Sequence, residues 1–262
     1  ISTSENVFSV GEIYKFNNIK ENNIICSCGL KINKCNFWNK INKNNYDIIN
    51  RYTIKDYLKM IFFIYNPLQK KINFTKYSKN YELFNNIKKN IKEQIILDSS
   101  KDIVRLVELH QDKRFEIYNI SIFRDGRAVA NSFNSTTQSQ GKNYFISLLK
   151  WIFINSSLKK IQKKCDINTL NISYNKFCEN PDEYLKKIEK FCNINIPSNY
   201  LEIARKMDYH NSGGNRLSLK ENRKKLKAIK IDEKWKSQQN KFTKTYANII
   251  TYIFNKKWVF KK

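Results

Sequence analysis

The chain has 262 residues, 41% of them hydrophobic and 14% aromatic, which is enough apolar material to bury one sizeable core. Lys and Arg number 49 against 23 Asp and Glu, and the formal net charge of +26 favours anionic partners such as nucleotides, nucleic acid, anionic lipid or sulfated glycans. The longest apolar runs, residues 60–65 and 148–154, are too short for a transmembrane helix of roughly 20 residues, so we expect a chain that is soluble or at most peripheral. An AT-rich coding bias also produces many Lys, Asn and Ile residues, so many of the lysines are expected to form only a solvated surface.

Three of the six cysteines, Cys26, Cys28 and Cys35, lie close together in the sequence. This grouping is compatible with a metal knuckle, a disulfide or ordinary packing. A zinc site needs four Cys or His ligands at recognisable spacing, and no fourth ligand is evident nearby. The grouping therefore favours ordinary packing, and we expect no metal.

The first strand–turn–helix pattern begins at Gln94. Residues 94–98 are short, apolar and β-branched, which predicts a buried strand that ends in a turn at Ser99 and Ser100. Either serine can cap the helix that should follow, with its apolar face over residues 103–110.

Two further strands are expected downstream. Residues 115–123 predict a strand that turns at 124–127 into a helix, and residues 169–173 predict another strand. The next helix has Asn180 as its cap and Pro181 at its first position, two residue types that commonly begin helices.

Strands that alternate with helices predict an α/β fold with a mostly parallel central sheet flanked by helices. We expect a single domain over residues 1–262, with a helical or loop insertion at residues 20–92. Ligands in such folds bind beyond the carboxyl ends of the strands. The turns at 99–101 and 124–127 are both polar and cationic, so we expect them to face one crevice.

Several motifs follow one another along the chain in a characteristic order. They are G-E at 11–12, C-S-C-G at 26–29, C-N-F-W at 35–38, D-S-S-K at 98–101, R-D-G-R-A-V-A-N-S at 124–132, Tyr174 followed by N-P-D-E-Y-L at 180–185, and H-N-S-G-G-N-R at 210–216. In order and spacing they resemble the sulfotransferases that use 3′-phosphoadenosine 5′-phosphosulfate (PAPS), especially the bacterial branch. The resemblance covers nearly the whole chain. It implies a P-loop-NTPase-like domain of three layers, with PAPS as co-substrate and no metal.

The resemblance also implies roles for the residues around the second turn. Arg124 and Ser132 match the pair that binds the 3′-phosphate, and a fixed cation with a hydroxyl donor suits that anion. Tyr174 matches the residue that contacts the adenine end. The alternative for Tyr174 is a half-buried strand aromatic.

Gly214, Asn215 and Arg216 match the late loop that closes on the nucleotide, where glycine allows a close approach of the backbone. The alternative is a plain surface turn before a basic helix at residues 220–230.

Sulfuryl transfer resembles phosphoryl transfer, so positioning and electrostatics should do most of the catalysis. Lys101, with Ser100 as a hydroxyl donor, is the candidate for stabilising the charge of the sulfuryl and leaving groups. The alternative for Lys101 is a solvated residue on the first helical turn.

Glu12 is the candidate base. Related tyrosylprotein sulfotransferases carry G-E-E with the second Glu as base, and Ile13 occupies that second position here. His110 and His210 are weaker candidates.

Family members begin with an R-S-G-[ST]-T loop for the 5′-phosphosulfate, about 15 to 20 residues upstream of the G-E element. Only ten residues precede Gly11 and none of them fits, so we expect weak PAPS binding. The acceptor would be a hydroxyl or amine of a glycan, lipid or small molecule, and the resemblance suggests a cytoplasmic protein. The alternatives are a basic nucleic-acid-binding module, for which no recognised motif is present, and a non-catalytic remnant of the family.

Overall fold

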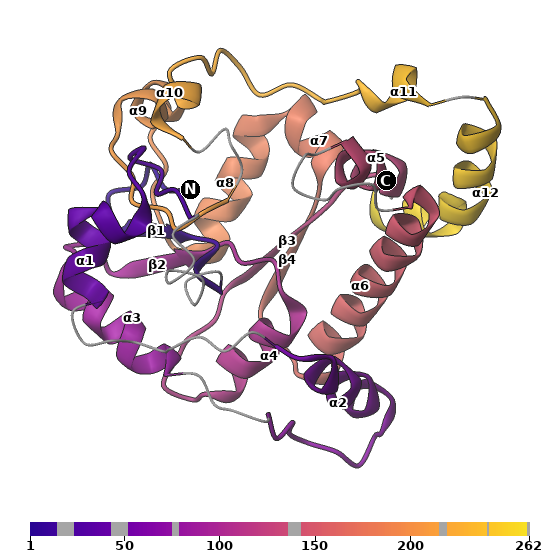
Figure 1. Ribbon diagram of the computed structural model, residues 1–262, viewed down its shortest axis with the longest axis horizontal. Helices are drawn as coiled ribbons and strands as arrows, with labels where there is room; N and C mark the ends of the chain where they lie inside the picture. The colour runs from indigo at the N-terminus through magenta and orange to yellow at the C-terminus, as the bar shows by residue number, and fades with distance from the viewer. Residues whose placement is uncertain are drawn as a thin grey trace. The chain divides into compact units, whose positions relative to one another are not determined.

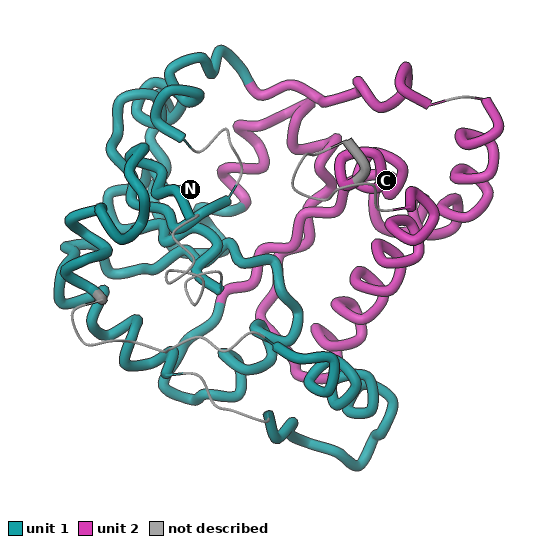
Figure 2. Tube along the Cα trace, in the orientation of Figure 1, with its two compact units in different colours: residues 1–117, 188–228 teal, residues 118–187, 229–262 magenta. Residues whose placement is uncertain are grey.

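The computed structural model describes residues 1–14, 24–42, 52–74, 79–135, 143–214, 219–239 and 241–260 (Figure 1). The chain divides into two compact units (Figure 2). Unit 1 comprises residues 1–117 and 188–228, and unit 2 comprises residues 118–187 and 229–262. Each unit contains a pair of parallel strands with helices around it, which confirms the predicted α/β class.

Unit 1 is built on strands β1 (Val7–Gly11) and β2 (Ile95–Asp98), which pair in parallel. Gly11 stands opposite Asp98, so the two strands end side by side. Its core contains buried Val10, Trp38 and Leu83. Its helices are η2 (Ile32–Lys34), α1 (Asn36–Asn42), α2 (Ile54–Tyr65), α3 (Asn80–Lys89), α4 (Ile103–Gln111), α9 (Tyr200–Lys206) and α10 (Lys220–Arg223).

Asp102 caps helix α4. Its carboxylate accepts the backbone N–H groups of Val104 and Arg105, at 2.8 and 3.1 Å. The expectation that Ser99 or Ser100 caps this helix is wrong. Ser100 is instead hydrogen-bonded to Asp98 within the turn, and the helix begins only at Ile103.

Unit 2 is built on strands β3 (Asn119–Phe123) and β4 (Thr169–Ser173), which are parallel and paired from Asn119 opposite Thr169 to Phe123 opposite Ser173. The prediction of β4 is confirmed. The strand expected over 115–123 begins only at Asn119, because the N–H of Phe115 closes a turn onto the carbonyl of Asp112. The helices of unit 2 are α5 (Gly126–Ser135), α6 (Tyr144–Lys164), α7 (Tyr174–Glu179), α11 (Trp235–Gln238) and α12 (Lys241–Trp258), and α8 (Pro181–Cys192) leads back to unit 1.

Buried aromatic side chains hold the helices of unit 2 to its strands. Phe123 of β3, Trp151 of α6 and Trp258 of α12 form one cluster, with the rings of the two tryptophans 5.4 Å apart. These side chains bury much apolar area and so anchor α6 and α12 where β3 ends. Helix α8 begins at Pro181, as predicted, and Asn180 precedes it.

The basic segment after residue 219 is less helical than expected. Only Lys220–Arg223 is helical, and residues 224–230 are not, whereas a helix was expected over 220–230. Like charges one turn apart repel each other, and this segment has no continuous apolar stripe to offset that repulsion. The described part of residues 20–92 consists of helices and loops. The extended residues in this range form only isolated β-bridges. No helix in the described ranges is both long and apolar enough to cross a membrane.

Candidate functional site

The carboxyl ends of β1 and β2 bring the three predicted catalytic residues together. Because Gly11 is paired with Asp98, Glu12 and the turn after β2 lie side by side, and the N–H of Ser99 donates to the carbonyl of Gly11 at 2.9 Å. Lys101 Nζ donates to Glu12 Oε1 at 2.8 Å. The Lys101 side chain is 71% exposed, whereas that of Glu12 is only 10% exposed. A solvent-exposed ammonium group is therefore paired with a largely buried carboxylate.

The turn that carries Lys101 is held by Asp98. Its Oδ1 accepts the backbone N–H of Ser100 at 2.9 Å and also the Ser100 hydroxyl, whose oxygen accepts the N–H of Tyr14 at 3.3 Å. In this arrangement the hydroxyl proton of buried Ser100 is directed at Asp98. Lys101 has a φ of 58°, the left-handed region that side chains other than glycine rarely occupy, and such strain is concentrated at functional turns.

Arg105 completes this support from helix α4. It is 2% exposed, donates from Nε to Asp98 Oδ2 at 2.7 Å and from Nη1 to Asn80 Oδ1 at 2.8 Å, and lies over the ring of Phe84. No signal in the sequence pointed to Asn80. Only the spacing of Asp98 and Arg105 across the strand–helix turn indicated a buried network. The turn is thus anchored by a buried ion pair.

The late loop is the H-N-S-G-G-N-R motif at residues 210–216, and its part around Ser212 lies against β1 in unit 1. Ser212 donates its N–H to the carbonyl of Val10 at 2.9 Å, and its own carbonyl accepts the N–H of Glu12 at 3.1 Å. A Cβ on Gly11, whose φ is 71°, would stand 2.9 Å from Asn211 Cβ, so only glycine permits this approach. Gly214 follows with a φ of 109°. Two predicted binding residues, Asn215 and Arg216, lie outside the described residues.

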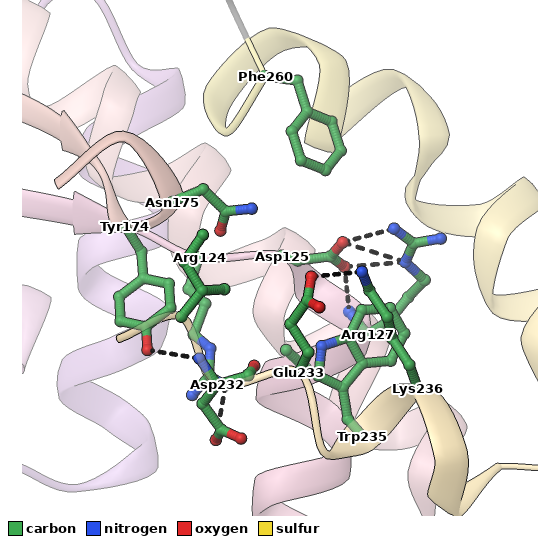
Figure 3. Close-up of a pocket in the computed structure, with 12 residues that line it drawn as sticks. Arg124, Asp125, Arg127, Tyr174, Asn175, Asp232, Glu233, Trp235, Lys236 and Phe260 are labelled. Atoms are coloured by element: carbon green, nitrogen blue, oxygen red, sulfur yellow. Dashed lines mark hydrogen bonds and ion pairs between the residues drawn. The ribbon is translucent and has the colours of Figure 1, made fainter. Parts of the chain in front are cut away.

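In unit 2, the register of β3 and β4 brings Arg124 and Tyr174 together. Phe123 is paired with Ser173, so the residues that follow them are neighbours, and the Arg124 guanidinium lies 4.7 Å from the centre of the Tyr174 ring (Figure 3). Arg124 Nη2 donates to Asp232 Oδ2 at 3.0 Å. Its Nε is buried, and no acceptor for it is present among the described residues. A buried arginine N–H without an acceptor is a position where a ligand oxygen can bind.

These two side chains line an open pocket together with the neighbouring turn. Asp125 accepts two hydrogen bonds from the guanidinium of Arg127, and Arg127 lies 4.9 Å from the ring centre of Trp235 (Figure 3). The cavity volume is about 120 Å³, smaller than the roughly 300–1,000 Å³ of most ligand sites, so it can hold one group of a nucleotide. The residues around it are Arg124, Asp125, Arg127, Ala128, Tyr174, Asn175, Ile231, Asp232, Glu233, Trp235, Lys236 and Phe260.

Ser132 does not line this pocket; it is exposed on helix α5. Tyr174 is the first residue of α7 and not a strand residue, and its hydroxyl accepts the N–H of Asp232 at 3.2 Å. Sequence reasoning missed Asp232, which lies 108 residues from Arg124. The two cationic turns belong to different units, so the expected common crevice stays a prediction.

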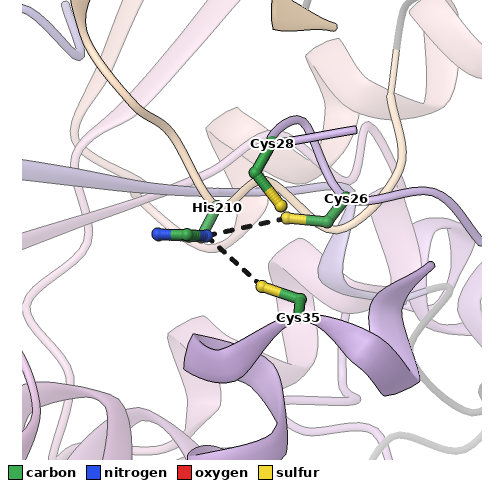
Figure 4. Close-up of side chains that lie close together, drawn as sticks. All are labelled: Cys26, Cys28, Cys35 and His210. Atoms are coloured by element: carbon green, nitrogen blue, oxygen red, sulfur yellow. Dashed lines mark hydrogen bonds between the residues drawn. The ribbon is translucent and has the colours of Figure 1, made fainter. Parts of the chain in front are cut away.

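A second cluster in unit 1 consists of Cys26, Cys28, Cys35 and His210 (Figure 4). Their sulfur and nitrogen ligand atoms all lie within 4.8 Å of one another. His210 Nδ1 is 3.3 Å from the sulfur of Cys35 and 3.8 Å from that of Cys26. Burial raises the pKa of the Cys26 and Cys35 thiols and lowers that of His210. His210 was not recognised as a possible fourth ligand because it lies 175 residues beyond Cys35.

No protein-family model matches this chain, and no curated protein or solved structure matches it either.

Proposed function

We propose that the protein is a sulfotransferase that moves the sulfuryl group of PAPS to a hydroxyl or amine of a glycan, lipid or small molecule. In this proposal the two units form one P-loop-like domain of three layers. The observation that supports it best is the pairing of Arg124 with Tyr174 directly after two parallel strands, with the buried Nε of Arg124 facing no described acceptor. The resemblance to PAPS-dependent sulfotransferases implies a nucleotide-binding role for the same two residues.

Arg124 and Tyr174 suit the nucleotide end of PAPS chemically. A guanidinium offers several donors in a planar fork to a phosphate, and a tyrosine ring offers a face for stacking on a base. The pocket is large enough for only one such group, so the remainder of the nucleotide would extend out of it. Ser132 keeps its predicted role at the 3′-phosphate only if the ligand extends along α5.

Lys101, Glu12 and Ser100 would carry the chemistry. In the reaction the bond from sulfur to the phosphate oxygen breaks, a bond from sulfur to the acceptor forms, and the acceptor loses a proton. Glu12, buried next to Lys101, would take that proton, and the exposed ammonium of Lys101 would neutralise the charge that grows on the leaving oxygen. Ser100 would hold the turn through Asp98 and could present its hydroxyl only by releasing that bond.

The test is a calorimetric titration of the whole chain with adenosine 3′,5′-bisphosphate, which lacks the sulfuryl group. We expect saturable binding that Arg124→Ala weakens at least about tenfold, because a charge-assisted hydrogen bond contributes about 1.5–3 kcal/mol. Arg114→Ala is the matched control. Arg114 also pairs with an aspartate, Asp112 at 2.7 Å, and lies 4.1 Å from the ring centre of Tyr81, but it is not in the pocket.

A random oligonucleotide is titrated in parallel over a range of salt concentrations. Steeply salt-dependent oligonucleotide binding without any bisphosphate signal would replace the sulfotransferase proposal with a nucleic-acid-binding function. Equal losses in Arg124→Ala and Arg114→Ala would show that only the overall positive charge attracts the bisphosphate, and would remove the role of the pocket.

A further inference from the structure

We propose that Cys26, Cys28, Cys35 and His210 bind one zinc ion, at a structural site that fastens the late loop to the N-terminal part of unit 1. Three thiols and an imidazole nitrogen converge on one point from three separate segments (Figure 4). This inference goes beyond the proposed function and does not depend on it, because none of the four residues belongs to the nucleotide or catalytic set.

The two sulfur-to-nitrogen distances from His210 are close to those of a tetrahedral zinc ion. Bond lengths of about 2.3 Å to sulfur and about 2.0–2.1 Å to nitrogen place tetrahedral ligands about 3.8 Å apart from sulfur to sulfur and about 3.6 Å from sulfur to nitrogen. The observed sulfur-to-nitrogen distances of 3.3 and 3.8 Å bracket this value. The ligand set also fits, since Cys3His is a usual set for structural zinc.

Backbone hydrogen bonds shape the segments that carry the three thiols. Cys26 and Cys28 lie in a tight turn in which the N–H of Gly29 donates to the carbonyl of Cys26 at 2.9 Å. Cys35 lies between η2 and α1, and its backbone N–H donates to the carbonyl of Ile32 at 3.2 Å. None of the cysteines is in a disulfide. A turn and a helix start therefore present three thiols toward the same point.

The imidazole is oriented by its surroundings. The ring of Phe37 stacks on that of His210, with centres 5.3 Å apart and planes 14° from parallel, and Trp38 Nε1 donates to the carbonyl of His210 at 2.7 Å. Nδ1 faces the sulfurs and the other ring nitrogen points away from them (Figure 4). Residues that fix the ring of a metal-binding histidine improve metal affinity.

Hydrogen bonds connect this cluster with the loop beside β1. Ser27, between two of the cysteines, accepts the N–H of Asn211 at 2.9 Å and donates to the carbonyl of Tyr209 at 2.7 Å. Ser212 then bridges to both Cys26 and Gly11. All four protein ligands would be used, which leaves no open position on the metal, so the ion would be structural. It would fix Ser212, whose carbonyl holds the backbone of Glu12.

Zinc binding must release protons to balance charge. Three thiols lose their protons to solvent and the neutral imidazole keeps its own, so the occupied site carries one net negative charge. The buried Arg223, whose guanidinium donates to the carbonyl of Met207 at 2.8 Å, lies close enough to Cys26 for an electrostatic interaction and would offset that charge.

The experiment measures metal content by mass spectrometry and Co²⁺ binding by absorption, on the whole chain prepared with a reductant. We expect about one zinc ion per chain as purified, and thiolate-to-metal charge transfer when Co²⁺ replaces it. Cys28→Ser, at a half-buried position, and His210→Ala should lose most of the bound metal. Cys165→Ser is the control, because it removes a half-buried thiol outside the cluster and should keep full zinc occupancy.

His210→Cys keeps the proposal testable even if the other variants fold poorly. It offers a fourth thiolate, so zinc should remain bound and the charge-transfer band of the Co²⁺ form should strengthen. Wild-type protein that takes up neither zinc nor Co²⁺, or a disulfide between two of the three cysteines in the reduced preparation, would overturn the proposal. Adenosine bisphosphate binding is measured separately, so its failure would leave the zinc result unaffected.

Discussion

The turns after β2 and β3 are closed by the same kind of aspartate side-chain hydrogen bond, but they place their cations differently. In each turn an aspartate accepts the backbone N–H two residues further on, Asp98 from Ser100 and Asp125 from Arg127, both at 2.9 Å. Asp98 is the last residue of β2, and Asp125 is the second residue after β3. This side-chain turn shapes the backbone locally. In the first turn the cation comes after the aspartate, at Lys101, and in the second it comes before, at Arg124.

The difference lies in what surrounds each cation. Lys101 is 71% exposed and its turn is supported from beneath by the buried pair of Asp98 and Arg105. Arg124 is half-buried, with 23% of its side chain exposed, and its guanidinium contacts both the ring of Tyr174 and the half-exposed carboxylate of Asp232. The first arrangement places a largely exposed ammonium on a turn with buried support, which suits transient charge at a reacting group. The second fixes a planar fork in place, which suits recognition of a phosphate.

The rigidity of the first turn can be broken at its buried ion pair. Asp98→Ala should lower the free energy of unfolding by about 3–5 kcal/mol, because it leaves the charge of Arg105 buried without its partner. The measurement is urea unfolding followed by circular dichroism. Arg105 is 2% exposed and donates to Asp98 at 2.7 Å, so little solvent is available to compensate.

Asp112→Ala is the control for this prediction, since it breaks a pair of the same kind with Arg114, whose side chain is 57% exposed. Only a small change in stability is expected there. If both variants lost the same stability, the first turn would not depend on its buried support.

The close approach of the late loop gives a second way to test the first turn. Gly11→Ala should cost about 3 kcal/mol, because the new Cβ adds a collision with Asn211 to the strain of a positive φ. The collision distance would be 2.9 Å. Gly29→Ala shares the positive φ, 93°, but meets nothing within 4 Å, and should cost only about 1 kcal/mol. Thermal unfolding of the two variants separates strain from collision, and equal losses would mean that the loop does not contact β1.

The helices and strands that were predicted correctly are specified by local sequence signals. The β-branched residues before Asp98, the five residues of β4 and the proline at 181 each specify their own element, and the structure contains all three. The expected burial of the strand before Asp98 is wrong, because Ile95 is 38% exposed and the other residues of β2 are only half-buried. The helix cap after β2 was assigned wrongly because serine and aspartate compete for the same role. Asp98 bonds Ser100 and leaves Asp102 to cap α4.

Partners distant in sequence could not be predicted in the same way. Asp232 lies 108 residues from Arg124 and His210 lies 175 residues from Cys35, and no period or local spacing links such pairs. Tertiary folding alone brings them together. The proposed fourth zinc ligand, His210, could therefore not be identified from the cysteine segment, although His210 is the first residue of the motif at 210–216.

The smallest expected effect concerns the second turn, where Asp232 competes with a phosphate for Arg124. Asp232→Asn should strengthen adenosine 3′,5′-bisphosphate binding about threefold, because an exposed ion pair contributes at most about 1 kcal/mol. Burial raises the pKa of Asp232, but the hydrogen bonds from Arg124 and from the backbone of Lys234, together with the charges of these two residues, lower it by more in sum. The net pKa is lowered, so the carboxylate stays ionised at neutral and mildly acidic pH and the gain should persist there. Glu233→Gln removes the same charge from the same pocket without touching Arg124. Equal gains in both variants would show that the second turn attracts anions through its total charge. The contrast between an oriented Arg124 guanidinium and an exposed Lys101 ammonium would then be lost.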